Sequence, residues 1–396
     1  MMFRETYLLM ISPDGNHNKY YKMIPTASGS WIAEYGRVGA RPQKRGYSAS
    51  EWAKKYREKI AKGYKDVTTL HATNTDSTSN YAPIKEASVA ELIDKLLMTS
   101  RQVIKSNYTI SSDVVTPQMV QQAQTLLNQL SCISNLTDFN EGLVKLYQTL
   151  PRAIVDVQGS LAQLPTDRKK IIQREQRLLD TMRGQVIVPK VTALNSKETI
   201  LDAVGLKIRP CTPTETDRIK KHLGKVSYLF NRAWKVVNKE TQGLFNNYIE
   251  EKSVKKKLLL WHGSRTENWW SILQTGLKLR PTNAILTGKM FGYGLYFAPD
   301  ASKSLGYTSL SGSRWASGVS DTAYMAVINV AYGKPFNVYS WDNKYTRITE
   351  QTLQNYCAGA NSLHAHSSKG MLRADEIVIY NEAQCTIQYL VELKRG

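Results

Sequence analysis

The hydrophobic pattern of this chain changes its period twice, and these changes limit what the chain can fold into. Up to about residue 66, short alternating runs such as "TYLLMI" and "KYYKMI" are separated by turn residues, which is typical of strands. From Ser88 the period becomes helical, and one face carries Val89, Leu92, Ile93, Leu96 and Leu97. After "VIVPKV" short β-branched and aromatic runs return between Gly, Pro and Asn. The pattern therefore predicts a multidomain α+β protein.

The domain boundaries are predicted from the same changes. We expect a small β-sheet with one helix in residues 1–67, a linker in 68–84, an all-helical bundle in 85–190 and a third domain in 191–396. The helix of the first domain should begin at Ser48 or Ser50. In the bundle, Ser88 and Glu91 have the spacing of a capping box, and Thr116 before Pro117 has that of a cap and a first-turn proline.

The third region has the pattern of an antiparallel sheet. "LLLWHG", "GYGLYFA", "AYMAVINVAYG", "ADEIVIYN" and "CTIQYLVEL" are strand-like, and they do not alternate regularly with helices. A doubly wound parallel sheet would need that alternation. We therefore predict an antiparallel α+β domain.

Composition indicates the kind of partner and compartment. The chain has 396 residues, with 53 Lys and Arg against 33 Asp and Glu, a formal charge of +20. Such an excess predicts attraction to a polyanion, of which nucleic acid is the first candidate. The four cysteines are far apart and form no C-x-x-C pair, which favours an intracellular compartment without disulfides or zinc. The run "YLLMI" is too short for a signal peptide, and no apolar window is long enough to span a membrane.

Several common sites are excluded by their spacing. In "GYGLYF" the third position of a dinucleotide fingerprint is Phe297, and no P-loop sequence occurs. His364 and His366 form an H-x-H pair in a Ser-rich segment, but the sequence offers no third ligand in view. We therefore predict no metal site.

Three segments combine residues that can carry chemistry. His262 and Gly263 follow the apolar run "LLLW", so a histidine and an open stretch of backbone lie together at a strand end. "MFGYGLYFAPDASKSLGY", residues 290–307, combines aromatic residues, glycines and Ser304. Glu376 is the last acid before the apolar strand "IVIY". Each residue alone has an ordinary structural explanation, but the three together predict one site.

At these residues the sequence resembles the catalytic domain of the poly(ADP-ribose) polymerases. "LLLWHGSRTENWWSILQTGL" is similar to the family's "LLWHGSR…N…IL…GL" segment, and "MFGYGLYFAPDASKS" to its "MFGxGIYFAxxxSKS" segment. "EIVIYNEAQ" resembles the family's closing strand. "WIAEYGRVGARPQ" looks like the WGR module of the DNA-dependent members, with Tyr35 in place of tryptophan, and the helical region is similar to their regulatory domain. The resemblance implies a split antiparallel sheet in the third domain.

The resemblance also implies roles for the site residues, with His262, Tyr296 and Glu376 as the family's catalytic triad. His262 would bind a ribose hydroxyl of NAD, and the backbone of Gly263 with the Ser304 hydroxyl would bind the nicotinamide carboxamide. Tyr296 and Tyr307 would stack on the nicotinamide ring. The remaining positions of the predicted NAD site are Ser264, Met290 and Lys303, and the last two also flank the acceptor site. NAD would be consumed as a substrate, with no further cofactor.

The basic N-terminal segment is the candidate for binding DNA. Between Tyr35 and Lys65, Lys and Arg outnumber the acids and alternate with aromatic residues. We predict phosphate contacts from Arg37, Arg41, Lys44 and Arg45, which would bind without base specificity. Charge alone fits a solvated helix or an RNA partner equally well, and the Trp52 and tyrosine side chains fit a core position as well as a binding one.

The sequence as a whole predicts an NAD-dependent ADP-ribosyltransferase that is activated by DNA breaks and elongates polymers. Its partners would be broken DNA and protein acceptors, including the enzyme itself. It would not bind a membrane, and it would be a monomer. It would act inside the cell, in the nucleus if the host is eukaryotic. The alternatives are a mono-transferase, or a DNA-end-binding scaffold with weak catalysis.

Overall fold

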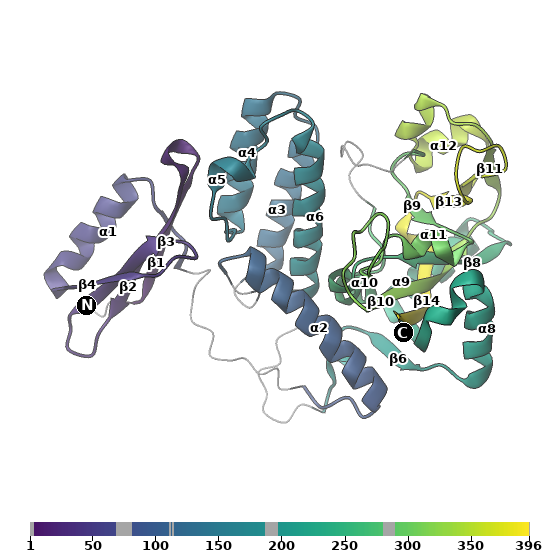
Figure 1. Cartoon of the computed structure of the whole chain (residues 1–396), viewed down its shortest axis with the longest axis horizontal. Helices are drawn as coiled ribbons and strands as arrows, with labels where there is room; N and C mark the ends of the chain where they lie inside the picture. The colour runs from purple at the N-terminus through teal and green to yellow at the C-terminus, as the bar shows by residue number, and fades with distance from the viewer. Residues whose placement is uncertain are drawn as a thin grey trace. The chain divides into compact units, whose positions relative to one another are not determined.

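The structure is a computed structural model, which describes residues 4–68, 81–110, 112, 115–186, 197–279 and 290–395. By its internal contacts the chain divides into two compact units, Met1–Thr78 with Arg101–Val186 and Ser79–Ser100 with Ile187–Gly396. Most of the predicted linker, residues 69–80, and the predicted boundary at residue 190 lie outside the described residues. Figure 1 labels the elements of both units.

A five-stranded antiparallel sheet opens the first unit, with strand order β4-β3-β2-β1-β5. Its strands are β1 (Thr6–Ser12), β2 (His17–Pro25), β3 (Trp31–Arg37), β4 (Gln43–Tyr47) and β5 (Lys65–Asp66). Alternate residues point to one face, where Leu8, Tyr21, Met23 and Trp31 are buried. The expected helix, α1 (Trp52–Ala61), follows a 3₁₀ turn that Ser48 and Glu51 cap reciprocally.

The aromatic residues of the basic segment belong to this core. The Trp31 ring stacks on Tyr47 at 4.6 Å and meets Trp52 edge-on at 5.1 Å between ring centroids. Tyr35, Tyr56 and Tyr64 also pack against the same cluster. Of the two interpretations open at the sequence level, the structure supports the core position for these rings.

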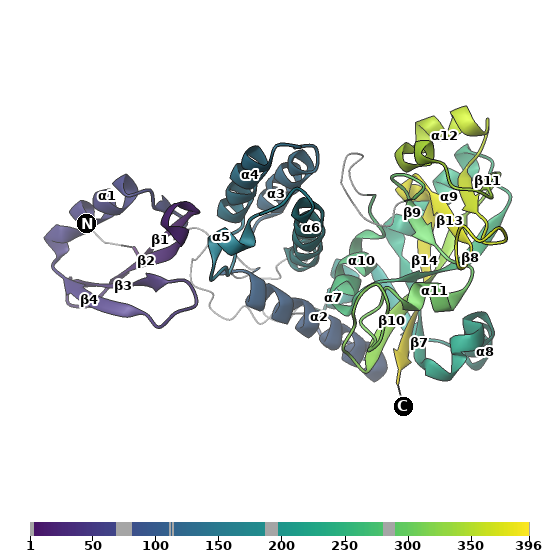
Figure 2. The same cartoon turned by 45° about the horizontal axis from the view of Figure 1, so that its top comes forward.

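The helices of the first unit form a compact group in which α3 contacts both α4 and α6 (Figure 2). They are α3 (Pro117–Leu130), α4 (Leu136–Thr149), α5 (Val157–Ser160) and α6 (Asp167–Val186), together with the end of α2 (Ala87–Asn107). As predicted, Thr116 caps α3 by accepting a hydrogen bond from the Met119 amide, with Pro117 in the first turn.

The beginning of α2 belongs to the second unit, although the predicted boundaries place the whole helix in the bundle. Its apolar face, with Val89, Leu92 and Leu96, joins a core that also contains Trp234 and Leu260. The predicted capping box is wrong, because α2 already begins at Ala87 and the side chains of Ser88 and Glu91 are used elsewhere. The Ser88 hydroxyl accepts a hydrogen bond from the Trp234 indole, and Glu91 pairs with Arg232.

Two sheets form the second unit. The five-stranded antiparallel sheet has the order β6-β7-β14-β10-β8, and the four-stranded sheet has the order β11-β12-β13-β9. The strands are β6 (Leu206–Pro210), β7 (Phe230–Asn238), β8 (Lys257–Gly263), β9 (Leu295–Phe297), β10 (Thr322–Ala331), β11 (Pro335–Val338), β12 (Ser362–Ala365), β13 (Glu376–Ile379) and β14 (Cys385–Lys394). The helices are α7 (Ile200–Ala203), α8 (Pro213–Leu223), α9 (Lys239–Glu251), α10 (Trp269–Thr275), α11 (Ala301–Leu305) and α12 (Glu350–Tyr356).

One strand pair departs from the predicted antiparallel pattern, because β11 and β12 run parallel. The connection between them contains α12, and a crossover of that length allows the chain to return in the same direction. The two sheets meet where Trp261 of β8 exchanges backbone hydrogen bonds with Ala298, directly after β9, at 2.8 and 3.1 Å. None of the described helices has both the length and the apolar composition to cross a bilayer.

Candidate active site

Three strand ends in the second unit meet around one cavity. His262 lies on β8, Tyr296 lies on β9, and Glu376 is the first residue of β13. β9 pairs with β13, and the bridge at Trp261 brings the end of β8 beside them. The cavity has a volume of about 190 Å³ and is lined by His262, Gly263, Tyr296, Phe297, Ala298, Lys303, Ser304, Tyr307 and Glu376. Three segments far apart in the sequence thus supply one site.

His262 is held in one orientation and one tautomer. Its Nδ1 lies 3.1 Å from the carbonyl oxygen of Tyr296. Because a carbonyl can only accept, Nδ1 carries the proton and Nε2 is left as a hydrogen-bond acceptor. Burial lowers the pKa of His262 below its ordinary value, so the ring stays neutral. A neutral Nε2 can accept a hydrogen bond from a ligand hydroxyl.

The backbone beside His262 is exposed to the cavity because residue 263 has no side chain. A Cβ at Gly263 would lie 1.9 Å from the carbonyl oxygen of Ser304, so only glycine fits between β8 and α11. The Ser304 hydroxyl donates to the carbonyl of Trp261 at 3.1 Å, and its oxygen keeps lone pairs that can accept from a ligand amide. This arrangement suits a flat ligand that carries an amide.

Glu376 and Lys303 form the charged part of the cavity. The Lys303 ammonium lies 2.9 Å from the Glu376 carboxylate and also donates to the carbonyl of Ala374 at 2.7 Å. Only 8% of the Glu376 surface is exposed. A carboxylate this deeply buried interacts strongly with any positive charge that develops nearby.

The two tyrosines of the cavity differ in rigidity. The Tyr296 hydroxyl donates to the carbonyl of Gly292 at 2.9 Å and accepts from the amide of Phe291 at 3.0 Å, which fixes its ring. Tyr307 is 42% exposed and stacks loosely on Trp315, with centroids 6.3 Å apart. Burial raises the pKa of both hydroxyls, so neither ionises at neutral pH.

Two predicted residues do not line the cavity, and two unpredicted ones do. The Ser264 hydroxyl accepts a hydrogen bond from the Asn268 amide, and Met290 packs in the cluster around Phe291. The unpredicted lining residues are Phe297 and Ala298. Their position directly after Tyr296, at the end of a short strand, is the signal that could have found them.

A larger hollow lies elsewhere in the second unit. It has a volume of about 870 Å³, and Tyr248, Tyr293, Gln354 and Tyr380 are among its lining residues. None of the predicted site residues lines it. We assign the site to the smaller cavity because that one combines a neutral histidine, a paired carboxylate and bare backbone.

The predicted phosphate-binding residues are in the first unit, on and around β3 and β4. The Arg37 guanidinium donates to the carbonyl of Val155, and Lys44 lies 3.3 Å from Glu34. Arg45 lies over the Tyr47 ring, 5.3 Å from its centroid. Arg41, Lys44 and Arg45 are exposed, whereas Arg37 is partly buried. Arg37 and Lys44 therefore already have partners within the first unit, whereas Arg41 and Arg45 present their charge to solvent.

Comparison with known proteins identifies the domain that contains this cavity. Residues 215–395 match the poly(ADP-ribose) polymerase catalytic domain. The putative poly [ADP-ribose] polymerase-like protein 100L of Invertebrate iridescent virus 6 is 35% identical over 155 residues, which are 38% of this chain and 78% of that protein. Uncharacterized protein 101L of the same virus is 32% identical over 183 residues, 45% of this chain and 76% of that protein. Human poly [ADP-ribose] polymerase 2 is 41% identical over 160 residues, 35% of this chain and 26% of that protein.

The class of enzyme follows from the matched domain together with the residues around the cavity. The protein is an ADP-ribosyltransferase that uses NAD as its substrate. The chain belongs to the poly(ADP-ribose) polymerase family.

Proposed function

We propose that this protein transfers ADP-ribose from NAD to protein acceptors, itself included, and extends the product into polymers when it binds broken DNA. The observation that carries the catalytic part is the position of Glu376, which faces the same small cavity as His262, Tyr296 and Lys303. The DNA-dependent part is supported by the basic segment on the first unit and by its resemblance to a WGR module.

The proposed placement of NAD uses the geometry of the cavity. The Gly263 backbone and the Ser304 hydroxyl would hold the carboxamide, since a ligand can approach the main chain closely there. The Tyr296 and Tyr307 rings would stack on the nicotinamide. His262 Nε2 would accept a hydrogen bond from a ribose hydroxyl on the adenosine side.

The proposed reaction breaks the bond between the nicotinamide nitrogen and the ribose carbon. Nicotinamide leaves as a neutral molecule, and positive charge develops on the sugar. The Glu376 carboxylate would bind a ribose hydroxyl and stabilise this charge more in the transition state than in the ground state. An acceptor oxygen then forms the new bond to the sugar carbon and releases its proton to solvent.

Elongation requires that the acceptor is a hydroxyl of the previous ADP-ribose unit. Glu376 can polarise that hydroxyl as well, because a single carboxylate has two oxygens. The Lys303 ammonium lies beside this carboxylate at the cavity wall. These contacts support polymer synthesis over transfer of a single unit.

The contacts inside the first unit support a link between DNA binding and the helices. Asn18, which is fully buried, donates to the carbonyls of Arg152 and Ile154, and Arg37 donates to that of Val155. The sheet that carries the proposed DNA contacts is therefore bonded directly to the connection between α4 and α5. We propose that DNA engagement acts on the helices through these bonds.

The test is incubation of the full chain with labelled NAD, with and without nicked or blunt-ended DNA. Wild type should produce a labelled smear of high molecular weight that requires DNA. Glu376→Gln should lower label incorporation by about 100-fold or more, because one stabilising group of this kind contributes about that much. Glu250→Gln, which changes an exposed carboxylate on α9, is the matched control.

Each other outcome has a defined meaning. A single sharp labelled band would establish mono-transfer in place of polymer synthesis. A DNA-independent smear would reject the activation by DNA. Binding of DNA without any label would favour a scaffold role.

A further inference from the structure

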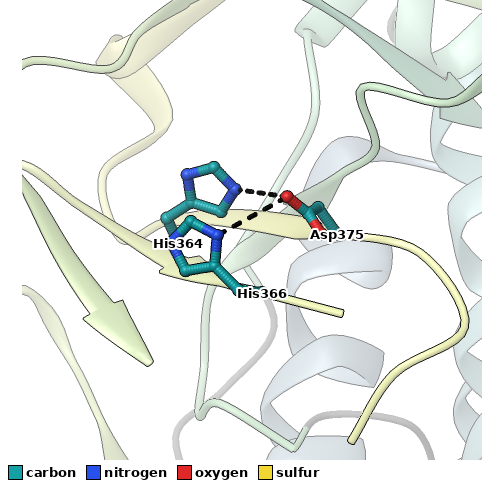
Figure 3. A group of neighbouring side chains, drawn as sticks. All are labelled: His364, His366 and Asp375. Carbon is teal, nitrogen blue, oxygen red and sulfur yellow. Dashed lines mark hydrogen bonds and ion pairs between the residues drawn. The ribbon is translucent and has the colours of Figure 1, made fainter. Parts of the chain in front are cut away.

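Two histidines and an aspartate meet beside the start of β13, outside the NAD cavity. His364 is in β12, His366 follows the end of that strand, and Asp375 directly precedes β13. Figure 3 shows the two imidazole rings stacked on each other, with one nitrogen of each directed at Asp375. Residues 364 and 366 lie on one face of the extended chain because strand side chains alternate. The loop back to β13 then brings Asp375 against both.

The distances between the three groups fit a shared ion. His364 Nε2 lies 3.0 Å and His366 Nδ1 lies 3.6 Å from the same carboxylate oxygen, Oδ2 of Asp375. A tetrahedral ion with bonds of about 2.0–2.1 Å holds its ligand atoms roughly 3.3 Å apart. The observed distances lie on either side of that value. The two rings are stacked with centroids 3.9 Å apart, so one ring must turn for both nitrogens to bind one metal.

The opposite side of each histidine has a partner of its own. His364 Nδ1 lies 2.9 Å from the Tyr332 hydroxyl, and His366 Nε2 lies 2.9 Å from Oδ1 of Asn337. The Asn337 oxygen can only accept, so His366 carries its proton on Nε2 and presents a lone pair at Nδ1. Metal-binding histidines are commonly oriented by such a bond from the second nitrogen.

Asp375 is oriented in the same way. Its other oxygen, Oδ1, accepts from the Ser367 amide at 2.8 Å and from the Ser367 hydroxyl at 2.7 Å. Oδ2 is therefore left facing the two histidines. Each of the three side chains has a second partner, and His364 Nε2 and His366 Nδ1 are both directed at Oδ2 of Asp375.

We propose that His364, His366 and Asp375 bind one divalent transition-metal ion of the zinc type. Two imidazole nitrogens with one carboxylate favour such an ion over Mg²⁺ or Ca²⁺, which prefer oxygen ligands. The three side chains keep 17%, 21% and 33% of their surface exposed, so a water molecule can complete the coordination. The sequence alone missed this site because Asp375 is separated from the H-x-H pair by a loop.

The proposed metal lies on the opposite side of the strand from the catalytic carboxylate. Ala365 pairs with Glu376, and cross-strand partners point to the same face. His364 and His366 flank Ala365 and therefore point to the other face. The metal would connect the end of β12 to the residue before Glu376, and so act as a positioning element for β13.

The experiment is a calorimetric titration with Zn²⁺ of the full chain, prepared without a histidine tag. Wild type should bind one ion per chain and gain thermal stability. Asp375→Asn and His366→Gln should lower the affinity by more than about 100-fold, and Asn337→Ala by about 10- to 100-fold, the usual effect of losing an outer partner. His17→Gln and Asp94→Asn, which change a histidine and an aspartate outside the cluster, should bind as wild type does.

The exposed position of Asn337 keeps the test decisive if a ligand variant fails to fold, because its replacement leaves the core untouched. Melting curves recorded without metal identify any variant that has lost its fold. The proposal is overturned if wild type takes up no Zn²⁺, or if the cluster variants bind it as tightly as the two controls. Equal binding of Mg²⁺ would overturn the assignment to a transition metal.

Discussion

Glycine 263 does in this site what no other residue type can do. A Cβ there would lie 1.9 Å from the Ser304 carbonyl oxygen and 2.8 Å from its carbon, so β8 and α11 would have to separate. Gly292 has a similar role, with φ of +78° and a Cβ position 2.2 Å from the Ile348 carbonyl oxygen. Both glycines were visible in the sequence as parts of motifs, but the atoms they make room for come from distant segments.

Gly263→Ala should therefore damage both the fold and NAD binding. We expect a loss of about 1–3 kcal/mol in the free energy of unfolding, the usual cost of overpacking. NAD binding should weaken in protein that remains folded, because the proposed carboxamide site would widen. Urea denaturation and calorimetric titration with NAD check the two effects.

Gly243→Ala is the matched control for that substitution. Gly243 lies inside α9 and a Cβ there would meet nothing within 4 Å. Replacement by alanine should stabilise the protein by about 0.4–1 kcal/mol and leave NAD binding unchanged. Equal behaviour of the two variants would contradict the steric argument.

At the scale of single elements, a local capping signal predicted the structure correctly where the capping side chain has no partner in another element. Thr116 caps α3, as the sequence predicts. The Ser88 and Glu91 pair has an equally good local signal, yet both side chains bond to β7 residues. Tertiary partners decided between two uses of the same polar groups.

Thr116→Ala should destabilise the first unit by about 1 kcal/mol, because the Met119 amide loses its acceptor. The measurement is the urea midpoint of unfolding of the full chain, monitored by circular dichroism. Thr125→Ala on the exposed face of the same helix changes the same residue type without a cap, and it should be neutral or slightly stabilising. A cap variant as stable as this control would contradict the assigned role.

At the scale of the whole molecule, α2 and the main sheet of the second unit are joined at one buried carboxylate. Glu392 of β14 is 1% exposed and bonds Arg232 of β7 and Tyr324 of β10, while Lys95 of α2 lies 3.9 Å away. Burial alone would raise the pKa of Glu392, but the hydrogen bonds from Tyr324, Arg232 and Asn231 outweigh it and lower the pKa below its ordinary value.

This lowered pKa predicts the direction of an acid effect. A carboxylate whose pKa is lower in the folded state contributes stability above its unfolded pKa of about 4.3, and that stability is lost as the pH falls through the folded value. Glu392→Gln should be less stable than wild type near pH 7, and the difference should shrink in acid. Glu250→Gln, at an exposed site, should show no such difference. Denaturation midpoints measured from pH 7 down to below the unfolded pKa of about 4.3 check the prediction.

The sequence by itself determined the helical and strand-rich regions and supplied the candidate residues of the site, because both depend on local patterns. Hydrophobic period, caps and the His262, Tyr296 and Glu376 motifs depend on residues close together in the chain. The tertiary structure alone decided which groups meet: Lys303 with Glu376, Arg37 with Val155, and Asp375 with the two histidines. These contacts join residues separated by whole strands or helices, and their free energy depends on packing that no local pattern records.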